Sequence, residues 1–291
     1  MPDYEIVADL PCQTGEGPLW HPDEKVVYFV DIPQGKLYRH DPATESTDVV
    51  YDEDRPVGGY TVQAEGALLL FRDKGNVVTF RDGTILDTVI DHVPGLESTR
   101  WNDVIADPLG GVFCGTMSSD AVAGRWYHLA ADGTLKQLLG DQGTPNGMGF
   151  SPDRKTLYYQ DSRKQTLWAF DYDDATGEAD NQRSLRVAKD HGDRGRGDGM
   201  TVDAEGNLWS CRWGGGCVLK CTPDGVPVAA YDLPAENVTS CCFAGPTMTD
   251  LYVTSAMGQH RTSTDDYAGS LFKMTPGVKG VEEFRSRMAT S

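Results

Sequence analysis

The sequence predicts an all-β fold, a six-bladed β-propeller, from two observations. A unit of about 44 residues recurs six times along the 291-residue chain, and each copy alternates short apolar runs with turn residues. Periods of ~40 to 50 residues with several strands per unit are typical of propeller blades. The turn anchors of the six copies are Pro22, Ala64, Pro108, Pro152, Ala204 and Gly245, which stand 42, 44, 44, 52 and 41 residues apart.

The segment 197–211, GDGMTVDAEGNLWSC, shows the unit, a strand, a turn and a second strand. Runs such as KVVYFVDI and GNLWSCRW follow the turns and are rich in strand-forming residues. A further run follows most of them, as in GKLYRHD and QTLWAFDYD, commonly closing in Asp-Gly or Pro-Gly turn chemistry. We therefore expect about four antiparallel strands per blade. The apolar run 4–10 precedes the first copy and is predicted to join the last blade, closing the ring and removing an open sheet edge.

Periodicity along the whole chain predicts a single domain spanning residues 1–291. A net charge of −18 argues against nucleic-acid binding and against anionic membranes, and no apolar run approaches the ~20 residues that span a bilayer. The start of the chain is acidic where a signal peptide needs positive charge. We expect a cytoplasmic monomer whose seven cysteines are mostly buried, reduced thiols.

Two segments interrupt the regular spacing of the copies. Residues 173–196 form the longest insertion, rich in Asp, Arg and Gly, and are predicted to be an exposed loop. Residues 91–100, DHVPGLESTR, lead into the third copy. Both segments deliver the chain to the start of an inner strand, on the rim where we expect a functional site.

One register position of the repeat is enriched in side-chain oxygens. The residues six before each anchor are Glu16, Gly58, Asn102, Asn146, Asp198 and Thr239, and four of these six are carboxylates or carboxamides. Equivalent positions of a propeller should surround its central axis. The next residue is Gly or Ser in five copies, and glycine lets backbones approach closely there.

Convergent oxygen ligands at a channel mouth suit a hard or borderline divalent cation. Glu16 and Asp198 would supply charge and Asn146 a neutral carbonyl. Without a cation the two carboxylates would repel each other, and one would hold a proton. Each residue alone is also typical of a turn cap; their common register favours metal or ligand binding.

Five pieces of the chain carry a family resemblance: TGEGPLWHP, STRWNDVIADPLGGVFCGTM, TPNGMGFSPDRKTLYYQDS, GDGMTVDAEGNLW and TSCCFAGPTMTDLYVTSA. Together they resemble the regucalcin (senescence marker protein) and gluconolactonase family of sugar lactonases, over nearly the whole chain. The resemblance implies one divalent metal held by a Glu, an Asn and an Asp, which match Glu16, Asn146 and Asp198. It further implies sugar contacts from Arg100 and Asn102, and places an acidic substrate contact on Asp120.

The implied activity is metal-dependent hydrolysis of an aldonolactone, such as a xylono-, arabino- or gluconolactone, to the open aldonic acid. The partner is then a small-molecule sugar lactone and the cofactor one ion of Ca²⁺, Mn²⁺, Mg²⁺, Zn²⁺ or Fe²⁺. The metal would act as a Lewis acid, Asp198 as general base, and Arg100 with Asn102 would orient the ring. The chain has no G-x-S-x-G motif for a serine nucleophile. A non-enzymatic calcium-binding or scaffold propeller and a phosphotriesterase-like hydrolase are the alternatives.

Four further residues have open roles at this stage. His21 lies in a turn and is expected to be structural, whereas His128 is a candidate for the pocket wall. Trp101, beside Arg100, suits either packing or a sugar platform. Asp103 replaces the usual Gly or Ser after the axial position, which is consistent with support of the site, a weak second cation site or a turn cap.

Overall fold

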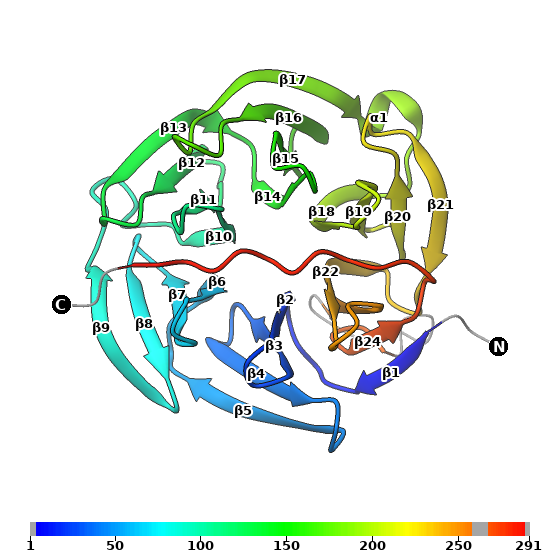
Figure 1. Ribbon diagram of the computed structural model, residues 1–291, viewed down its shortest axis with the longest axis horizontal. Coiled ribbons are helices and arrows are strands. Elements are labelled where there is room, and N and C mark those ends of the chain that lie inside the picture. Colours follow the sequence, from blue (N-terminus) through cyan, green and yellow to red (C-terminus); the bar gives the residue numbers. More distant parts are fainter. Residues whose placement is uncertain (1–3, 258–266, 289–291) are drawn as a thin grey trace.

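The computed structural model describes residues 4–257 and 267–288 and contains six four-stranded antiparallel sheets arranged in a ring (Figure 1). This confirms the predicted six-bladed propeller. From the axis outward, the first blade contains β2 (Gly15–His21), β3 (Val26–Asp31), β4 (Lys36–Asp41) and β5 (Ser46–Asp52). The second contains β6 (Val57–Val62), β7 (Leu68–Arg72), β8 (Val77–Arg81) and β9 (Thr84–Ile90). The third contains β10 (Trp101–Ala106), β11 (Val112–Thr116), β12 (Gly124–Leu129) and β13 (Leu135–Gln142).

The other three blades follow the same order from the axis outward. The fourth blade contains β14 (Pro145–Phe150), β15 (Thr156–Asp161), β16 (Thr166–Tyr172) and β17 (Ala179–Val187). The fifth contains β18 (Arg196–Val202), β19 (Leu208–Trp213), β20 (Cys217–Cys221) and β21 (Pro227–Asp232). The sixth contains β22 (Asn237–Ala244), β23 (Asp250–Ala256), β24 (Leu271–Met274) and β1 (Glu5–Ala8). The one helix among the described residues, α1 (Ala188–His191), is far too short to cross a membrane, and no described helix is long and apolar enough to do so.

The ring is closed by its first strand. β1 pairs antiparallel with β24, as predicted, so the last blade contains both ends of the repeat array. The Tyr4 ring packs edge-on against Phe272 at 5.9 Å between centroids. Lys273 and Glu5 form an ion pair of 2.7 Å across the strands. The pairing covers an edge that would otherwise expose unpaired backbone groups.

Burial falls from the axis to the rim. All six residues of β6 and of β14 are buried, whereas β9 and β21 alternate between exposed and half-buried positions. This alternation has the period of a strand with one face in water. The core lies between adjacent sheets, where large aromatic side chains such as Trp126 and Trp209 are fully buried. All seven cysteines are buried as well.

The C-terminal segment 278–288 crosses the ring (Figure 1). It bridges Gly280 to Asp203 of the fifth blade and Ser286 to Gln63 of the second, and the Ser286 hydroxyl lies 2.7 Å from that of Thr61. These contacts lie near the turns that follow the inner strands, opposite the axial residues. The C-terminal segment therefore covers one end of the central channel.

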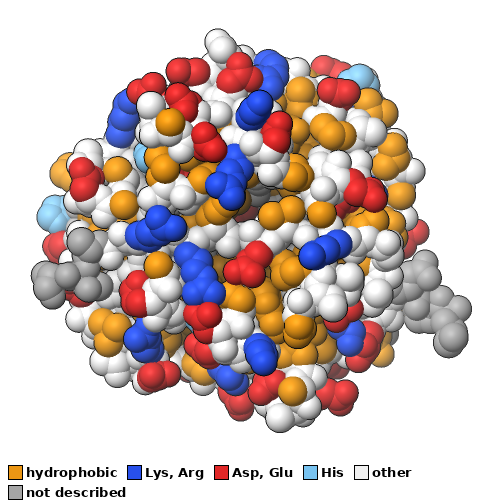
Figure 2. All heavy atoms as spheres, viewed as in Figure 1, with side chains coloured by type: hydrophobic (Ala, Val, Ile, Leu, Met, Phe, Trp, Pro, Cys, Tyr) orange, Lys and Arg blue, Asp and Glu red, His pale blue; other side chains and the backbone are white. Residues whose placement is uncertain are grey.

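Figure 2 shows basic and acidic side chains interspersed over the face of the molecule seen in that view.

The insertion 173–196 is not the loop predicted from its composition. It contains β17, the outermost strand of the fourth blade, followed by α1. The strand was hidden because it is polar: its residues 180–184 are all exposed, so it lacks an apolar stripe. Residue Gly192, at a positive φ of 68°, ends the helix and returns the chain towards β18.

Candidate functional site

The six residues of the axial register all lie near the start of an innermost strand. In every blade the pairing of this strand with its neighbour shifts by one residue at that point, for example between Glu16 and Leu19 and between Gly197 and Met200. One extra residue on the inner strand is a β-bulge, which re-aims side chains locally. The repeated bulge therefore accompanies the axial position in all six blades.

Glycines allow the inner strands to approach each other at the axis. A Cβ on Gly147 would meet the backbone nitrogen of Met200 and, at 2.6 Å, the carbonyl oxygen of Asp198. At the axial position of the second blade, a Cβ on Gly58 would collide with the carbonyl oxygen of Trp101. The second blade therefore has no room for an axial side chain, which explains why it contributes no oxygen.

A cavity of about 300 Å³ opens at these residues, which is within the size range of small-molecule sites. It brings together four predicted side chains of the axial register, Glu16, Asn102, Asn146 and Asp198, with the predicted Arg100. Its other lining residues are Thr14, Ile32, Met117, Thr144, Ser162, Arg163, Arg196 and Trp213. The axial Thr239 is used otherwise, because its hydroxyl donates to the Gly15 carbonyl oxygen at 2.6 Å.

Hydrogen bonds fix both carboxamides. Asn146 Nδ2 donates to Asp198 Oδ1 and, at 3.0 Å, to the Ser162 hydroxyl. Asn102 Nδ2 donates to the Pro145 carbonyl oxygen at 2.7 Å, and its Oδ1 accepts from Arg100 Nη1 at 2.8 Å. The amide oxygen of Asn146 takes no part in these hydrogen bonds and is left free, whereas the amide oxygen of Asn102 already accepts a hydrogen bond from Arg100.

Burial dominates the electrostatics of the site. It raises the pKa of Asp198 to about 8, with the nearby Asp103 adding to the rise. Burial also raises the pKa of Glu16 well above its ordinary value, followed by the charges of Asp198 and Asp103. The pKa of Arg100 falls to about 10 for the same reason, opposed by Glu16 and Asp198. Two buried carboxylates close together disfavour ionisation unless a cation joins them.

The donor set suits one hard divalent cation. Glu16 Oε1, Asn146 Oδ1 and Asp198 Oδ2 accept no hydrogen bond within residues 4–257 and 267–288, although all three side chains line the same cavity. Carboxylate and carboxamide oxygens that line a cavity and accept no hydrogen bond from the protein are typical ligands of such ions. The described residues contain no cluster of three or more His, Cys, Asp or Glu side chains arranged for a metal. The candidate set is thus a mixed one of two carboxylates and a carboxamide.

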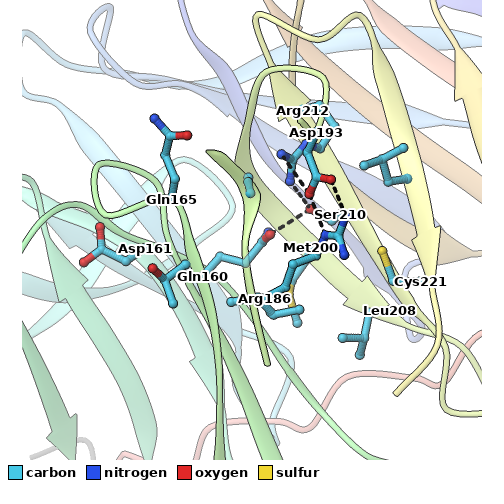
Figure 3. A pocket seen from close by; sticks show the side chains of 15 residues that line it. Gln160, Asp161, Gln165, Arg186, Asp193, Met200, Leu208, Ser210, Arg212 and Cys221 are labelled. Atoms are coloured by element: carbon cyan, nitrogen blue, oxygen red, sulfur yellow. Dashed lines mark hydrogen bonds and ion pairs between the residues drawn. The ribbon is translucent and has the colours of Figure 1, made fainter. Parts of the chain in front are cut away.

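A buried polar network supports Asp198 from the side of its backbone. Gln160 Nε2 donates to the Asp198 carbonyl oxygen at 2.7 Å, and Gln160 Oε1 accepts from the Ser210 hydroxyl at 2.7 Å. Arg212 donates to the carbonyl oxygens of residues 194 and 195, just before β18. Figure 3 shows the part of this network formed by Gln160 and Ser210 and by Asp193 with its two arginine partners, Arg212 and Arg186. The start of β18 is therefore held on both sides.

The remaining candidates lie elsewhere. The side chain of Asp120 is fully exposed, outside the cavity lining, and pairs with Arg163 at 3.1 Å. His128 lies outside the axial cavity and contacts Asp107 Oδ2 through Nε2 at 2.6 Å. Trp101 is fully buried against Phe71, so packing is its role.

The other two open residues also differ in position. His21 Nε2 lies 3.0 Å from the Gly66 carbonyl oxygen, which fits the structural role expected of it. Asp103 caps the next backbone N–H, of Val104, and lines a separate cavity of about 30 Å³ with Glu283 of the C-terminal segment. Its lining includes the residues that directly follow the axial position in four blades, Gly17, Gly59, Asp103 and Ser240.

Sequence reasoning missed a second ring of cavity residues. Thr14, Thr144 and Arg196 lie two positions before Glu16, Asn146 and Asp198, as Arg100 lies two before Asn102. Side chains two apart on a strand share a face, so this register could have been extended from the axial one. Ile32, Met117, Ser162 and Trp213 lie at or just beyond the ends of the second strands of four blades.

Comparison with known proteins agrees with this architecture. A family model described as SMP-30/Gluconolactonase/LRE-like region matches residues 14–257. Pentonolactonase XacC of Haloferax volcanii is 43% identical over 289 residues, covering 96% of this chain and 97% of that protein. Regucalcin of Danio rerio is 35% identical, covering 96% and 97%. The crystal structure of a calcium-binding protein, regucalcin, from Agrobacterium tumefaciens superposes with a TM-score of 0.89 at 28% identity, covering 97% of both chains.

Proposed function

The chain belongs to the SMP-30/gluconolactonase/LRE-like family, and we propose that it hydrolyses a sugar lactone to the open-chain sugar acid. One observation carries the proposal: three open oxygens, on Glu16, Asn146 and Asp198, share a cavity with the paired Arg100 and Asn102. A cation site beside fixed hydrogen-bond donors suits a cyclic ester that also carries hydroxyl groups. The relative named a pentonolactonase supports an aldonolactone as the substrate class.

Glu16, Asn146 and Asp198 would hold the metal. When bound, a divalent ion supplies Lewis acidity towards the ester carbonyl and lowers the pKa of a nearby water. Regucalcin relatives and the calcium-binding neighbour support a divalent ion. Which of Ca²⁺, Mg²⁺, Mn²⁺, Zn²⁺ or Fe²⁺ serves stays open to metal analysis, and a cytoplasmic location and a monomeric state stay predictions from the sequence.

Asp198 is the proposed general base. The Asp198 side chain lines the cavity, and its Oδ2 atom accepts no hydrogen bond among the described residues, whereas Oδ1 accepts one from Asn146. Asp198 would accept the proton of the attacking water as the new C–O bond forms at the lactone carbonyl carbon. The same proton can then pass to the ring oxygen as the ester C–O bond breaks, which leaves the open aldonic acid. Its carboxyl group then ionises to the aldonate and releases one proton to the solvent.

Arg100 and Asn102 would orient the sugar. Arg100 Nη1 is committed to Asn102 and to the Trp101 carbonyl oxygen, so the guanidinium is held in one orientation. Its remaining N–H groups and the second amide hydrogen of Asn102 are left as donors for hydroxyl oxygens. Fixing the substrate in this way lowers the entropic cost of reaching the transition state.

Proton release tests the proposal. Purified protein would be assayed with pentono- and hexonolactones and with a phosphotriester, each with chelator and with added divalent ions. We expect lactone hydrolysis that needs a divalent ion. Phosphotriester turnover alone would favour the phosphotriesterase-like alternative, and ion binding without any turnover would favour the calcium-binding scaffold.

A further inference from the structure

The lining of the axial cavity contains more basic than acidic side chains. Its lining includes three guanidinium groups, of Arg100, Arg163 and Arg196, against two carboxylates, Glu16 and Asp198. The protein as a whole has a net charge of −18. The charged side chains that line the cavity thus carry a net positive charge, whereas the protein as a whole is negative. The two carboxylates of the lining are the ones that we assign to the cation.

Arg196 is the cation without a partner. Its guanidinium makes no ion pair or hydrogen bond with any described residue, and its contact is with the Trp213 ring, at 5.8 Å from the centroid. Trp213 is its cross-strand neighbour in β19. An exposed guanidinium stacked on an indole keeps its five N–H donors available at the edge of the plane.

The backbone beneath Arg196 is held in place. Arg212 Nε donates to the Arg194 carbonyl oxygen at 2.9 Å, and Arg212 Nη2 donates to that of Gly195 at 3.0 Å. Arg212, which is labelled in Figure 3, thus fixes the segment that leads into β18. Arg196 is two residues before Asp198 on this strand, and both side chains line the cavity. The guanidinium is therefore placed on the same strand as the proposed base, and its charge also acts on Asp198.

Arg163 provides a second, weakly held cation. It lies just beyond β15, and its one ion pair among the described residues is with Asp120, a fully exposed side chain, at 3.1 Å. Its Nη1 atom also donates to the Ser119 carbonyl oxygen at 3.4 Å. Exposed ion pairs contribute little and exchange readily. Replacing Asp120 by an incoming anion as the partner of Arg163 therefore costs little stabilising energy.

We propose that Arg163 and Arg196 form an anion subsite, and that this enzyme prefers sugar lactones whose exocyclic end carries a negatively charged group. The inference rests on the proposed lactonase function and specifies its substrate class. Guanidinium groups bind carboxylate and phosphate oxygens in the same bidentate manner, so an aldarolactone and a phosphorylated aldonolactone are the two sources of such an anion. Trp213, Ile32 and Met117 supply the apolar wall for the ring.

Three substrates separate these possibilities: a neutral hexonolactone, the hexarolactone with a carboxylate at C6, and the 6-phosphohexonolactone. We expect kcat/KM to be at least about tenfold higher for one of the two anionic lactones than for the neutral one, the magnitude of one charge-assisted hydrogen bond. R196Q should lower kcat/KM about tenfold more for the anionic lactone than for the neutral one, because any effect of the lost charge on Asp198 is common to both substrates. R163Q should act in the same direction.

R183Q is the matched control, because Arg183 is an exposed arginine on the outer strand β17 that pairs with Asp171. It makes the same change in net charge away from the cavity and should leave all three substrates unaffected. Equal losses on neutral and anionic lactones in R196Q, or a wild-type preference for the neutral lactone, would overturn the subsite while leaving lactonase activity established.

Binding gives an independent readout. Calorimetric titration with a hexarate dianion and with the hexonate monoanion should show tighter binding of the dianion by wild-type protein, and the difference should disappear in R196Q. If no lactone is hydrolysed, the proposed function fails, and this titration still decides the subsite. Equal affinity of wild-type protein for both sugar acids would contradict it.

Discussion

Asn146 donates a hydrogen bond from its Nδ2 atom to the carboxylate of Asp198, joining the fourth and fifth blades directly at the axis. The same nitrogen reaches the Ser162 hydroxyl at 3.0 Å. With both contacts made by nitrogen, the amide oxygen of Asn146 is left for another partner. This orientation leaves Asn146 Oδ1 and Asp198 Oδ2 as two of the three oxygens that we assign to the cation.

Asp198→Asn tests that carboxylate, since it retains the shape and removes the charge. We expect kcat to fall by at least about 100-fold, because general-base catalysis and one metal oxygen are lost together. Divalent-ion affinity, measured by calorimetry, should fall in the same variant. In chelator, where neither protein is stabilised by the ion, the melting temperature of the variant should not fall below that of the wild type, which distinguishes a lost function from a lost fold. Normal turnover would exclude Asp198 as the base.

Asn102→Ala separates substrate binding from metal binding. Asn102 Oδ1 holds Arg100 at 2.8 Å, so its removal frees the guanidinium that we assign to the sugar hydroxyls. We expect KM to rise about tenfold, the magnitude of one or two lost hydrogen bonds, with a smaller effect on kcat and none on metal affinity. Loss of the metal instead would place Asn102 among the ligands.

The stability of the metal-free protein should fall as pH rises. Burial raises the folded-state pKa of Asp198 to about 8, whereas an unfolded aspartate titrates near ~4. The folded state therefore binds the extra proton between these values, and its stabilising effect, complete below about pH 4, is lost as pH rises through about 8. In chelator, the melting temperature should decrease from pH 5 to pH 8.

Two comparisons check the origin of this decrease. Asp198→Asn should flatten the pH profile, and Asp180→Asn, at an exposed position on β17, should leave it unchanged. Adding a divalent ion at pH 8 should restore the melting temperature, because ionised Glu16 and Asp198 bind it. A wild-type profile that rises with pH would contradict the assignment of the buried carboxylates.

The propeller and the axial residues could be predicted because each repeats with chemistry of its own, a turn every 41 to 52 residues and an oxygen-bearing side chain six before it. The neighbouring register escaped notice because its members alternate between threonine, as in Thr14, and arginine, as in Arg196, so no single kind of side chain repeats there. β17 was missed because an outer strand with exposed polar residues lacks the apolar alternation on which recognition depends. The pairing of Asp120 with Arg163 depends on distant loops, which no local pattern encodes.

Removing residues 1–8 tests closure of the ring. Without β1, the backbone groups of β24 that pair with it would be exposed, and Phe272 would lose its edge-on contact with Tyr4. From the partly buried apolar surface that is lost, we expect a decrease in melting temperature of about 5–10 °C. Lys273→Gln, which removes only the ion pair with Glu5, should cost far less. An unchanged melting temperature after the deletion would show that closure contributes nothing to stability.

Close approach of the inner strands can be tested at Gly147. A methyl group there would meet backbone atoms of Met200 and Asp198, which cannot rotate away as a side chain can. Gly147→Ala should therefore destabilise the fold by about 1–3 kcal/mol and displace the Asp198 backbone, weakening divalent-ion binding. Gly140→Ala is the control, because a Cβ on this exposed residue of β13 meets only the flexible end of Gln137. If both variants bind the ion as wild-type protein does, the spacing of the axial strands does not set the geometry of the site.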